Sequence, residues 1–278
     1  MAAPGNQSGG PLARGLMSRW KRVVARTVSE CRSVGVALQG SRPGFRILLY
    51  HAVGSSVAAD SYGFSVLPGR FAQQMDLLSH RPDVEIVDLA GGLRSRGRLR
   101  VAVTFDDGYK DILTTAAPTL LQYRIPFTVF ATSALLGSSS DYLMPAELRE
   151  LAGLPGVTIG SHGLTHTPLG ECGDTVLRRE LEESRRRLEE LLGRPVIAVA
   201  YPHGSVDQRV RREAARAGYR LGACSRSTIN AADRDPLLLC RTEIIGADST
   251  RVFAQKLDGA WDWIRWRSPD PALIEQVN

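Results

Sequence analysis

The chain has 278 residues, of which 43% are hydrophobic and 23% charged, and this balance excludes a largely disordered protein. Lys and Arg total 35 against 29 Asp and Glu, giving a net charge of +6. Residues 1–40 hold six basic side chains against Glu30 alone, so residues 41–278 carry 29 basic and 28 acidic side chains. Because this body is almost neutral and shows no nucleic-acid motif, we expect no nucleic-acid partner.

The excess charge divides the chain into a basic extension, residues 1–40, and a domain, residues 41–278. Within the extension, residues 12–38 can form an amphipathic helix that makes peripheral contact with an anionic membrane. A helix packed on the domain and a partly disordered tail are the alternatives. No apolar run reaches the roughly 18–20 residues of a membrane span, and charged residues interrupt 20–39, so neither a transmembrane helix nor a signal peptide is predicted.

The four cysteines are scattered without a CxxC pair, which favours reduced thiols over a disulfide framework. We therefore expect a protein of the cytoplasm or of the cytoplasmic face of a membrane. The oligomeric state is left open.

From residue 45 onward, short apolar runs alternate with helical patterns. Strands are predicted at 45–50, 84–87, 101–105, 125–131, 157–160, 196–200, 219–224 and 237–240. Helices are predicted at 69–80, 111–122, 145–152, 174–192 and 206–217. The alternation indicates an α/β fold with a parallel sheet, either a β/α barrel or a doubly wound sheet.

The clearest helix is 174–192, where leucines mark one face. We expect Asp174 or Thr175 to cap its start, and Gly193 ends it. Its many Glu and Arg residues predict a solvated face and not a binding site.

Two carboxylates, Asp106 and Asp107, directly follow the strand 101–105 and precede Gly108. In β/α folds the carboxyl ends of the strands meet at the active face. A glycine there lets the chain turn both carboxylates toward one pocket, where one can hold a metal and the other can take a proton. The alternative is a loop pair that caps the helix starting near Asp111.

Two histidines, His162 and His166, follow the strand 157–160. Gly163 and Pro168 oppose a continuous helix, so the four-residue spacing predicts a loop closed around an ion. Neutral imidazole suits zinc, nickel, cobalt or iron, and two histidines with one carboxylate leave positions for water and substrate. Two structural histidines are the alternative.

A third polar cluster, Tyr201-Pro202-His203-Gly204, follows the strand 196–200. Pro202 fixes the backbone, Gly204 permits close approach of a ligand, and the His203 amide can donate to an oxyanion. An ordinary turn is the alternative. His51, after the strand 45–50, can act as a general acid near neutral pH, or is a plain strand-end histidine.

TFDDG at 104–108, HGLTH at 162–166 and YPHG at 201–204 together resemble the motifs of the polysaccharide deacetylase family. The family is also known as the NodB-homology domain or carbohydrate esterase family 4. The resemblance covers about residues 45–250. The resemblance implies a distorted (β/α) barrel, with Asp106 as the catalytic base. It also implies Asp107, His162 and His166 as ligands of a divalent metal, zinc first and nickel, cobalt or iron as alternatives.

LLYH at 48–51 resembles the opening strand of exopolysaccharide (poly-N-acetylglucosamine-type) deacetylases, which implies His51 as the general acid. The usual C-terminal Leu-x-x-His motif of the family is missing from the late chain, and the chain departs from the family at two further places. Gly163 stands where the family usually has Ser or Thr, so a hydrogen bond that braces the loop is lost. The arginine that positions the base is missing from 198–200, so it either comes from elsewhere in the chain, with Arg241 as the candidate, or is absent.

The resemblance implies a metal-dependent hydrolase that removes N-acetyl groups from a glycan containing N-acetylhexosamine. The substrate can be a polysaccharide, an oligosaccharide or a lipid-linked glycan. An O-acetyl esterase or another amide hydrolase on the same metal site is the alternative among enzymes. A glycan-binding relative without catalysis is the alternative outside them.

Overall fold

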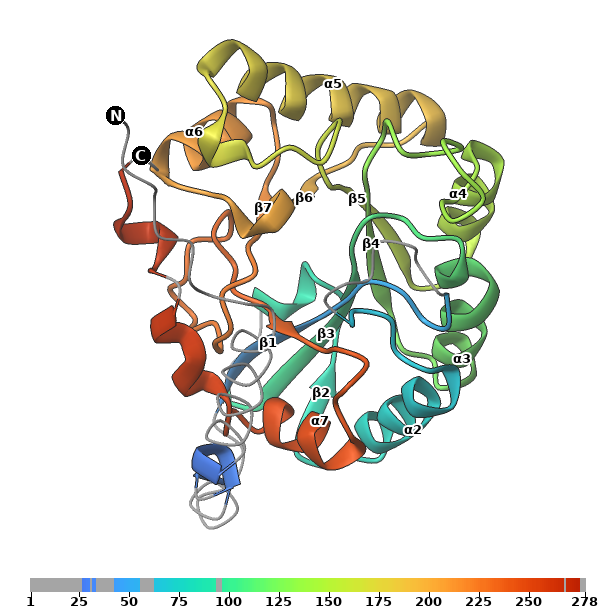
Figure 1. Cartoon of the computed structure of the whole chain (residues 1–278), viewed down its shortest axis with the longest axis vertical. Coiled ribbons are helices and arrows are strands. Elements are labelled where there is room, and N and C mark those ends of the chain that lie inside the picture. Colours follow the sequence, from blue (N-terminus) through green and yellow to red (C-terminus); the bar gives the residue numbers. More distant parts are fainter. Residues whose placement is uncertain are drawn as a thin grey trace, which may run out of the picture.

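A curled, parallel β-sheet forms the centre of the molecule (Figure 1). The computed structural model describes residues 27–30, 32–33, 43–55, 63–93, 97–267 and 269–275. The strands are β1 (Gly44–Tyr50), β2 (Val84–Ile86), β3 (Leu99–Phe105), β4 (Phe127–Ala131), β5 (Val157–Ser161), β6 (Ala198–Ala200), β7 (Leu221–Ala223) and β8 (Thr242–Glu243). Their order is β7-β6-β5-β4-β3-β1-β8, and β2 pairs with β3.

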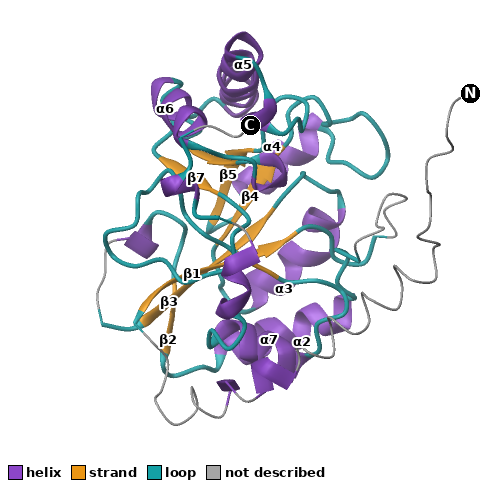
Figure 2. Cartoon of the chain, turned by 60° about the vertical axis from the view of Figure 1, so that its left-hand side comes forward, coloured by secondary structure: helices purple, strands orange, loops and turns teal. Residues whose placement is uncertain are grey.

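This half-barrel with flanking helices confirms the expected distorted (β/α) barrel. The helices are α2 (Pro68–Ser79), α3 (Ala117–Gln122), α4 (Pro145–Gly153), α5 (Asp174–Leu192), α6 (Gln208–Arg216) and α7 (Thr250–Leu257). Figures 1 and 2 show that they lie around the outside of the sheet. Neighbouring parallel strands are usually connected by a helix that crosses from the end of one strand to the start of the next. For this reason the alternation of strand and helix patterns in the sequence predicted this architecture.

β1 and β3 are the two longest strands, and every residue of both is buried. Burial on both faces explains why they appear in the sequence as nearly continuous apolar runs. Their register pairs Gly44 with Leu99 and Tyr50 with Phe105. Consequently His51 and Asp106, the next residue of each strand, emerge side by side at the same edge of the sheet.

Two layers of apolar side chains hold the sheet in place. Tyr50, Phe71, Phe105 and Phe127 belong to the larger layer between the sheet and the helices, and their rings contact one another at centroid distances of 5.3 to 5.9 Å. The opposite face carries a smaller cluster inside the half-barrel. Its members are Phe45, Ile47, Leu89, Ala102, Phe130, Ala198, Ala200, Leu221, Ala223 and Leu239.

The predicted helix 174–192 is confirmed at both ends, and Gly193 closes it in the left-handed conformation with φ 65°. Its predicted cap is wrong, because Gly173 is the N-cap and no side chain caps the helix. The predicted strand 237–240 is also wrong, since only Leu239 makes an isolated bridge, to Ala223. The predicted helix 111–122 is a π-helical turn, Ile112–Ala116, followed by α3.

Part of the basic extension contacts the domain. Residues 27–30 are helical, Ser29 is buried, and the indole Nε1 of Trp263 donates to Ser29 Oγ at 3.0 Å. The other residues of the predicted amphipathic helix 12–38, apart from 32 and 33, lie outside the described residues, so its membrane contact stays a prediction. Among the described helices, none has the length and apolar character that a membrane span requires.

Candidate active site

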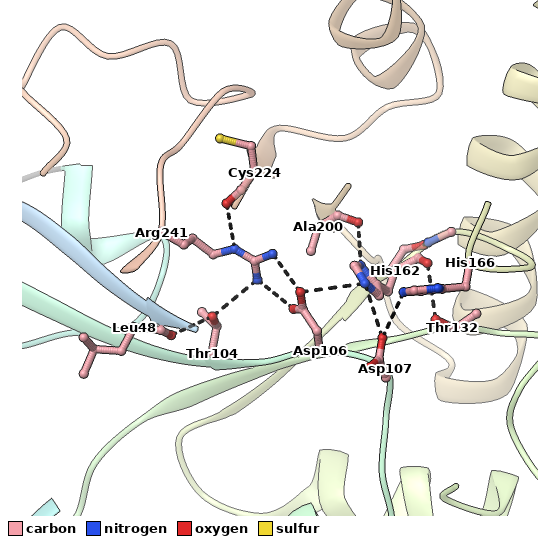
Figure 3. Close-up of polar contacts among 12 residues, drawn as sticks. Leu48, Thr104, Asp106, Asp107, Thr132, His162, His166, Ala200, Cys224 and Arg241 are labelled. Carbon is pink, nitrogen blue, oxygen red and sulfur yellow. Dashed lines mark hydrogen bonds and ion pairs between the residues drawn. The ribbon is translucent and has the colours of Figure 1, made fainter. Parts of the chain in front are cut away.

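The two carboxylates after β3 point in different directions (Figure 3). The amide of Asp106 donates to the carbonyl of Tyr50 at 3.0 Å, which continues the pairing of β3 with β1. Asp107 then adopts the left-handed conformation with φ 72°, and Gly108 follows with φ 83°. Because the chain turns back at Asp107, Asp106 faces Arg241 while Asp107 faces the two histidines.

Arg241 forms a two-pronged ion pair with Asp106. Its Nη1 and Nη2 each donate to one carboxylate oxygen at 2.7 Å, and its Nε donates to the carbonyl of Cys224 at 3.0 Å. The exposed fractions of the Arg241 and Asp106 side chains are 0% and 3%, so water does not screen this pair. The sequence prediction that Arg241 orients Asp106 therefore has a matching geometry.

Asp107, His162 and His166 form a cluster suited to a metal ion. Asp107 Oδ1 lies 3.4 Å from His162 Nε2 and 3.2 Å from His166 Nε2, and the three ligand atoms lie within 4.8 Å of one another. Asp107 Oδ1 is buried, and no donor among the described residues meets it with hydrogen-bond geometry. An orphaned carboxylate oxygen facing two imidazole nitrogens fits a divalent ion.

The orientation of His162 supports the same conclusion. Its Nδ1 lies 2.8 Å from the carbonyl oxygen of Ala200, at the end of β6. A carbonyl oxygen can only accept, so Nδ1 carries the proton and the lone pair of Nε2 faces Asp107. Histidine ligands of metals are usually oriented by such a bond to the other ring nitrogen.

Burial and charge set the protonation states in the site. Burial raises the pKa of Asp106, but Arg241 outweighs it and the pKa lies below its ordinary value. The pKa of Asp107 is also lowered, since contacts with His166 and His162 outweigh burial. Burial lowers the pKa of His162 despite both carboxylates. The residue is therefore neutral, as a metal ligand must be.

Backbone strain concentrates at the site. Among the described residues, four that are not glycine have positive φ, and three of them are Asp107 at 72°, His166 at 66° and His203 at 58°. The His203 ring meets the His166 ring edge-on, with centroids 4.5 Å apart. Strained conformations of this kind persist where the surrounding structure enforces them, typically at functional sites.

His51 lies at the end of β1. Its ring stacks on Phe64 with centroids 4.4 Å apart, and its buried Nδ1 has no hydrogen-bond partner among the described residues. The loop after it is held by Asp111, whose Oδ2 accepts from the amides of Val53 at 2.7 Å and Ser55 at 3.0 Å. Asp111 therefore anchors the loop that follows His51, the predicted general acid.

The residues of the third motif, 201–204, differ in burial and in what their side chains contact. Tyr201 is fully buried and its hydroxyl donates to the carbonyl of Leu237 at 2.8 Å, so its side chain is engaged away from the metal ligands. Pro202 is buried, whereas His203 is exposed. His203 and Gly204 line a cavity of about 530 Å³ that also contacts Cys224 and Arg226.

One buried carboxylate near the site, Glu180 of α5, was missed. It contradicts the expectation that the Glu and Arg residues of this helix form only a solvated face, because Glu180 is 3% exposed. The pattern contained a clue: Glu180 lies three residues after Leu177 and directly before Leu181, on the buried stripe of the helix.

Comparison with known proteins shows what this fold and its motifs are similar to. Residues 94–222 match the sequence model of the family described as polysaccharide deacetylase, and this range includes all three motifs. YxkH of Bacillus subtilis (strain 168), a polysaccharide deacetylase by name, is 24% identical over 158 residues. That match spans 57% of this chain and 56% of the relative, so the chain matches only about half of the curated relative's length.

Two solved structures share the fold. The Streptococcus pyogenes deacetylase PplD, solved in complex with acetate, has a TM-score of 0.69 and 24% identity, covering 78% of this chain and 99% of PplD. IcaB from Ammonifex degensii has a TM-score of 0.64 and 24% identity, covering 78% of this chain and 98% of IcaB. Over residues 94–222, which carry all three motifs, the chain is therefore similar to the polysaccharide deacetylase family.

Proposed function

We propose that the chain is a metal-dependent hydrolase that removes N-acetyl groups from a glycan containing N-acetylhexosamine. The observation that carries the proposal is the position of Asp106, whose Oδ2 lies 3.7 Å from His162 Nε2 while Arg241 holds both oxygens. A base is thus fixed beside the three candidate metal ligands. A divalent ion held by Asp107, His162 and His166, zinc being our first choice, would polarise the acetyl carbonyl and acidify a water molecule.

Asp106 takes the proton of the attacking water. Arg241 uses one lone pair on each carboxylate oxygen, which leaves further lone pairs free to accept that proton. Because Arg241 lowers the pKa of Asp106, the carboxylate is ionised at neutral pH. Arg241 therefore acts as a positioning residue.

His51 acts on the nitrogen of the reacting amide, and the third motif acts on its carbonyl oxygen. His51 protonates the leaving amine, since it emerges beside Asp106 and its Nδ1 is not engaged with another described residue. The His203 amide donates to the oxyanion, in a turn with φ 58° at His203 and 67° at Gly204. Acetate and a glycan with a free amine are the products.

The arrangement favours an amide over an ester substrate. An amine is a poor leaving group until it is protonated, so a histidine beside the base is worth most to an N-deacetylase. O-acetyl ester hydrolysis on the same site is the alternative reaction. A glycan binder without catalysis is the alternative outside enzymes. Binding alone would not require a carboxylate, Asp106, that Arg241 fixes beside the candidate metal ligands.

A direct test measures acetate release by the zinc-loaded full chain from N-acetylglucosamine oligomers and from O-acetylated oligosaccharides. We expect release from the amides, and loss of it in Asp106→Asn and His162→Ala. Asp233→Asn is the matched control, because Asp233 is exposed and distant in sequence from the motifs. Release from esters alone would indicate the esterase, and no release from either class would contradict the enzymatic proposal.

A further inference from the structure

We propose that Glu180 is a positioning residue that holds the loop 162–166 in its metal-binding shape. The proposal rests on the metal site proposed above. Glu180 lies on α5, outside the motifs of the family, and is 3% exposed.

The carboxylate of Glu180 accepts three hydrogen bonds from the middle of the loop. Its Oε2 accepts from the amides of Leu164 at 2.8 Å and Thr165 at 3.0 Å, and its Oε1 accepts from Thr165 Oγ1 at 2.5 Å. Hydrogen bonds to an ionised acceptor are stronger than neutral ones. The segment between the two histidines is therefore fastened to a rigid helix.

The opposite side of the loop is held by backbone contacts with the segment after β4. The amide of Ser133 donates to the carbonyl of Gly163 at 3.2 Å, and the amide of Ala134 donates to the carbonyl of Leu164 at 2.9 Å. The carbonyl groups of the loop are thus fixed by the segment after β4, and its amide groups are fixed by Glu180. Without Glu180, the buried amide of Leu164 and the part-buried amide of Thr165 would lose their acceptor.

Gly163 and Glu180 occupy complementary space. Gly163 has φ 76°, and a Cβ at this position would lie 3.2 Å from Glu180 Oε2, which is tighter than most real contacts. Gly163 has no side chain of its own that could brace the loop from within. Instead, Glu180 of helix α5 holds the loop, and the absence of a Cβ at Gly163 leaves room for the Glu180 carboxylate.

The charge of Glu180 is also unusual. Among the residues that the structure describes, no Lys or Arg forms an ion pair with this carboxylate. A buried charge without a counterion is unfavourable unless it is well hydrogen-bonded. A divalent cation at the neighbouring site would add a favourable long-range interaction, so the brace and the metal stabilise each other.

Zinc affinity of the full chain, measured by competition with a chromogenic chelator, tests the proposal. We expect Glu180→Gln and Glu180→Ala to weaken binding about 10- to 100-fold, the usual effect of removing a partner that orients ligands. Glu182→Gln is the matched control: it makes the same change on the same helix at an exposed position and should stay within about twofold.

A double variant separates bracing from general stability. Gly163→Ser alone should weaken zinc binding, because its Cβ crowds Glu180 and adopts positive φ. In the Glu180→Ala background the space is free and the new hydroxyl can brace the loop, so the double variant should bind more tightly than Glu180→Ala alone. Additive losses would contradict this coupling.

The outcomes distinguish the two proposals. If the wild type binds zinc and Asp107→Asn does not, but Glu180→Gln binds like the wild type, the role of Glu180 is overturned and the metal site stands. The role of Glu180 is likewise overturned if its variants only lower the melting temperature of the zinc-free protein. If the wild type itself binds no zinc, both proposals fall. Should Glu180→Ala not fold, the nearly isosteric Glu180→Gln decides the question.

Discussion

Arg241 donates a hydrogen bond of 2.7 Å to each carboxylate oxygen of Asp106, although 135 positions separate the two residues in the sequence. The contact exists because β8, which starts one residue after Arg241, pairs with β1, and β1 pairs with β3. The guanidinium therefore reaches Asp106 from the β8 side of the sheet and not from β6. This route explains how residues 198–200 can lack an arginine while the carboxylate is still held.

Breaking this pair should destabilise the protein. Arg241→Met leaves the Asp106 carboxylate buried without a counterion, which we expect to cost about 3–5 kcal/mol in the free energy of unfolding. Urea denaturation measures the loss. Asp106→Asn combined with Arg241→Met should cost clearly less than the sum of the single variants, and strict additivity would contradict a direct ion pair.

The same pair should control the pH dependence of the reaction. Arg241 lowers the pKa of Asp106, so its removal raises that pKa and the base becomes protonated at a higher pH. In Arg241→Lys, which lacks the planar fork, the acid limb of kcat/KM should therefore move to higher pH. An acid limb that stays in place would mean that another group controls it.

Replacing each of the two adjacent carboxylates, Asp106 and Asp107, should have a different effect on turnover and on zinc binding. Asp106→Asn should reduce kcat by about 10²- to 10⁴-fold while zinc affinity is largely retained, because a base is lost and the ligands remain. Asp107→Asn should release the metal. Zinc content and acetate release, measured on the same samples, check both. Equal loss of zinc in the two variants would show that the carboxylates do not divide these roles.

His51→Gln should reduce turnover of amide substrates by about 10²- to 10⁴-fold, since the leaving amine loses its proton donor. Activity toward an activated ester, whose leaving group needs no proton, should fall much less. His80→Gln is the matched control, because His80 lies at the exposed end of α2. Equal losses on both substrates would contradict a role in protonating the leaving group.

Metal removal should destabilise the folded chain. With the ion at 100 times its dissociation constant, binding adds about 2.7 kcal/mol to the free energy of unfolding, so a chelator should lower the melting temperature and added zinc should restore it. Asp107→Asn is the control that should not respond to either. A wild type that is indifferent to chelator would argue against a bound structural or catalytic ion.

Elements with a long, regular pattern were predicted well. Helix 174–192 was correct at both ends because its leucine stripe and terminal glycine are local features. β8 was missed, since two residues form no pattern of their own and are a strand only through pairing with β1. The strand expected at 237–240 has suitable residues, but it makes only one bridge, at Leu239.

By itself, the sequence determined the fold class and the candidate groups Asp106, Asp107, His162 and His166, because motif spacing and alternating periodicity are short-range properties of the chain. Only the tertiary structure decided that Arg241 faces Asp106, that the Ala200 carbonyl orients His162, and that Glu180 braces the loop. The physical reason is that these contacts depend on strand order and on how a helix packs against the sheet. Such contacts join residues 15 to 135 positions apart, beyond the range over which local pattern is informative.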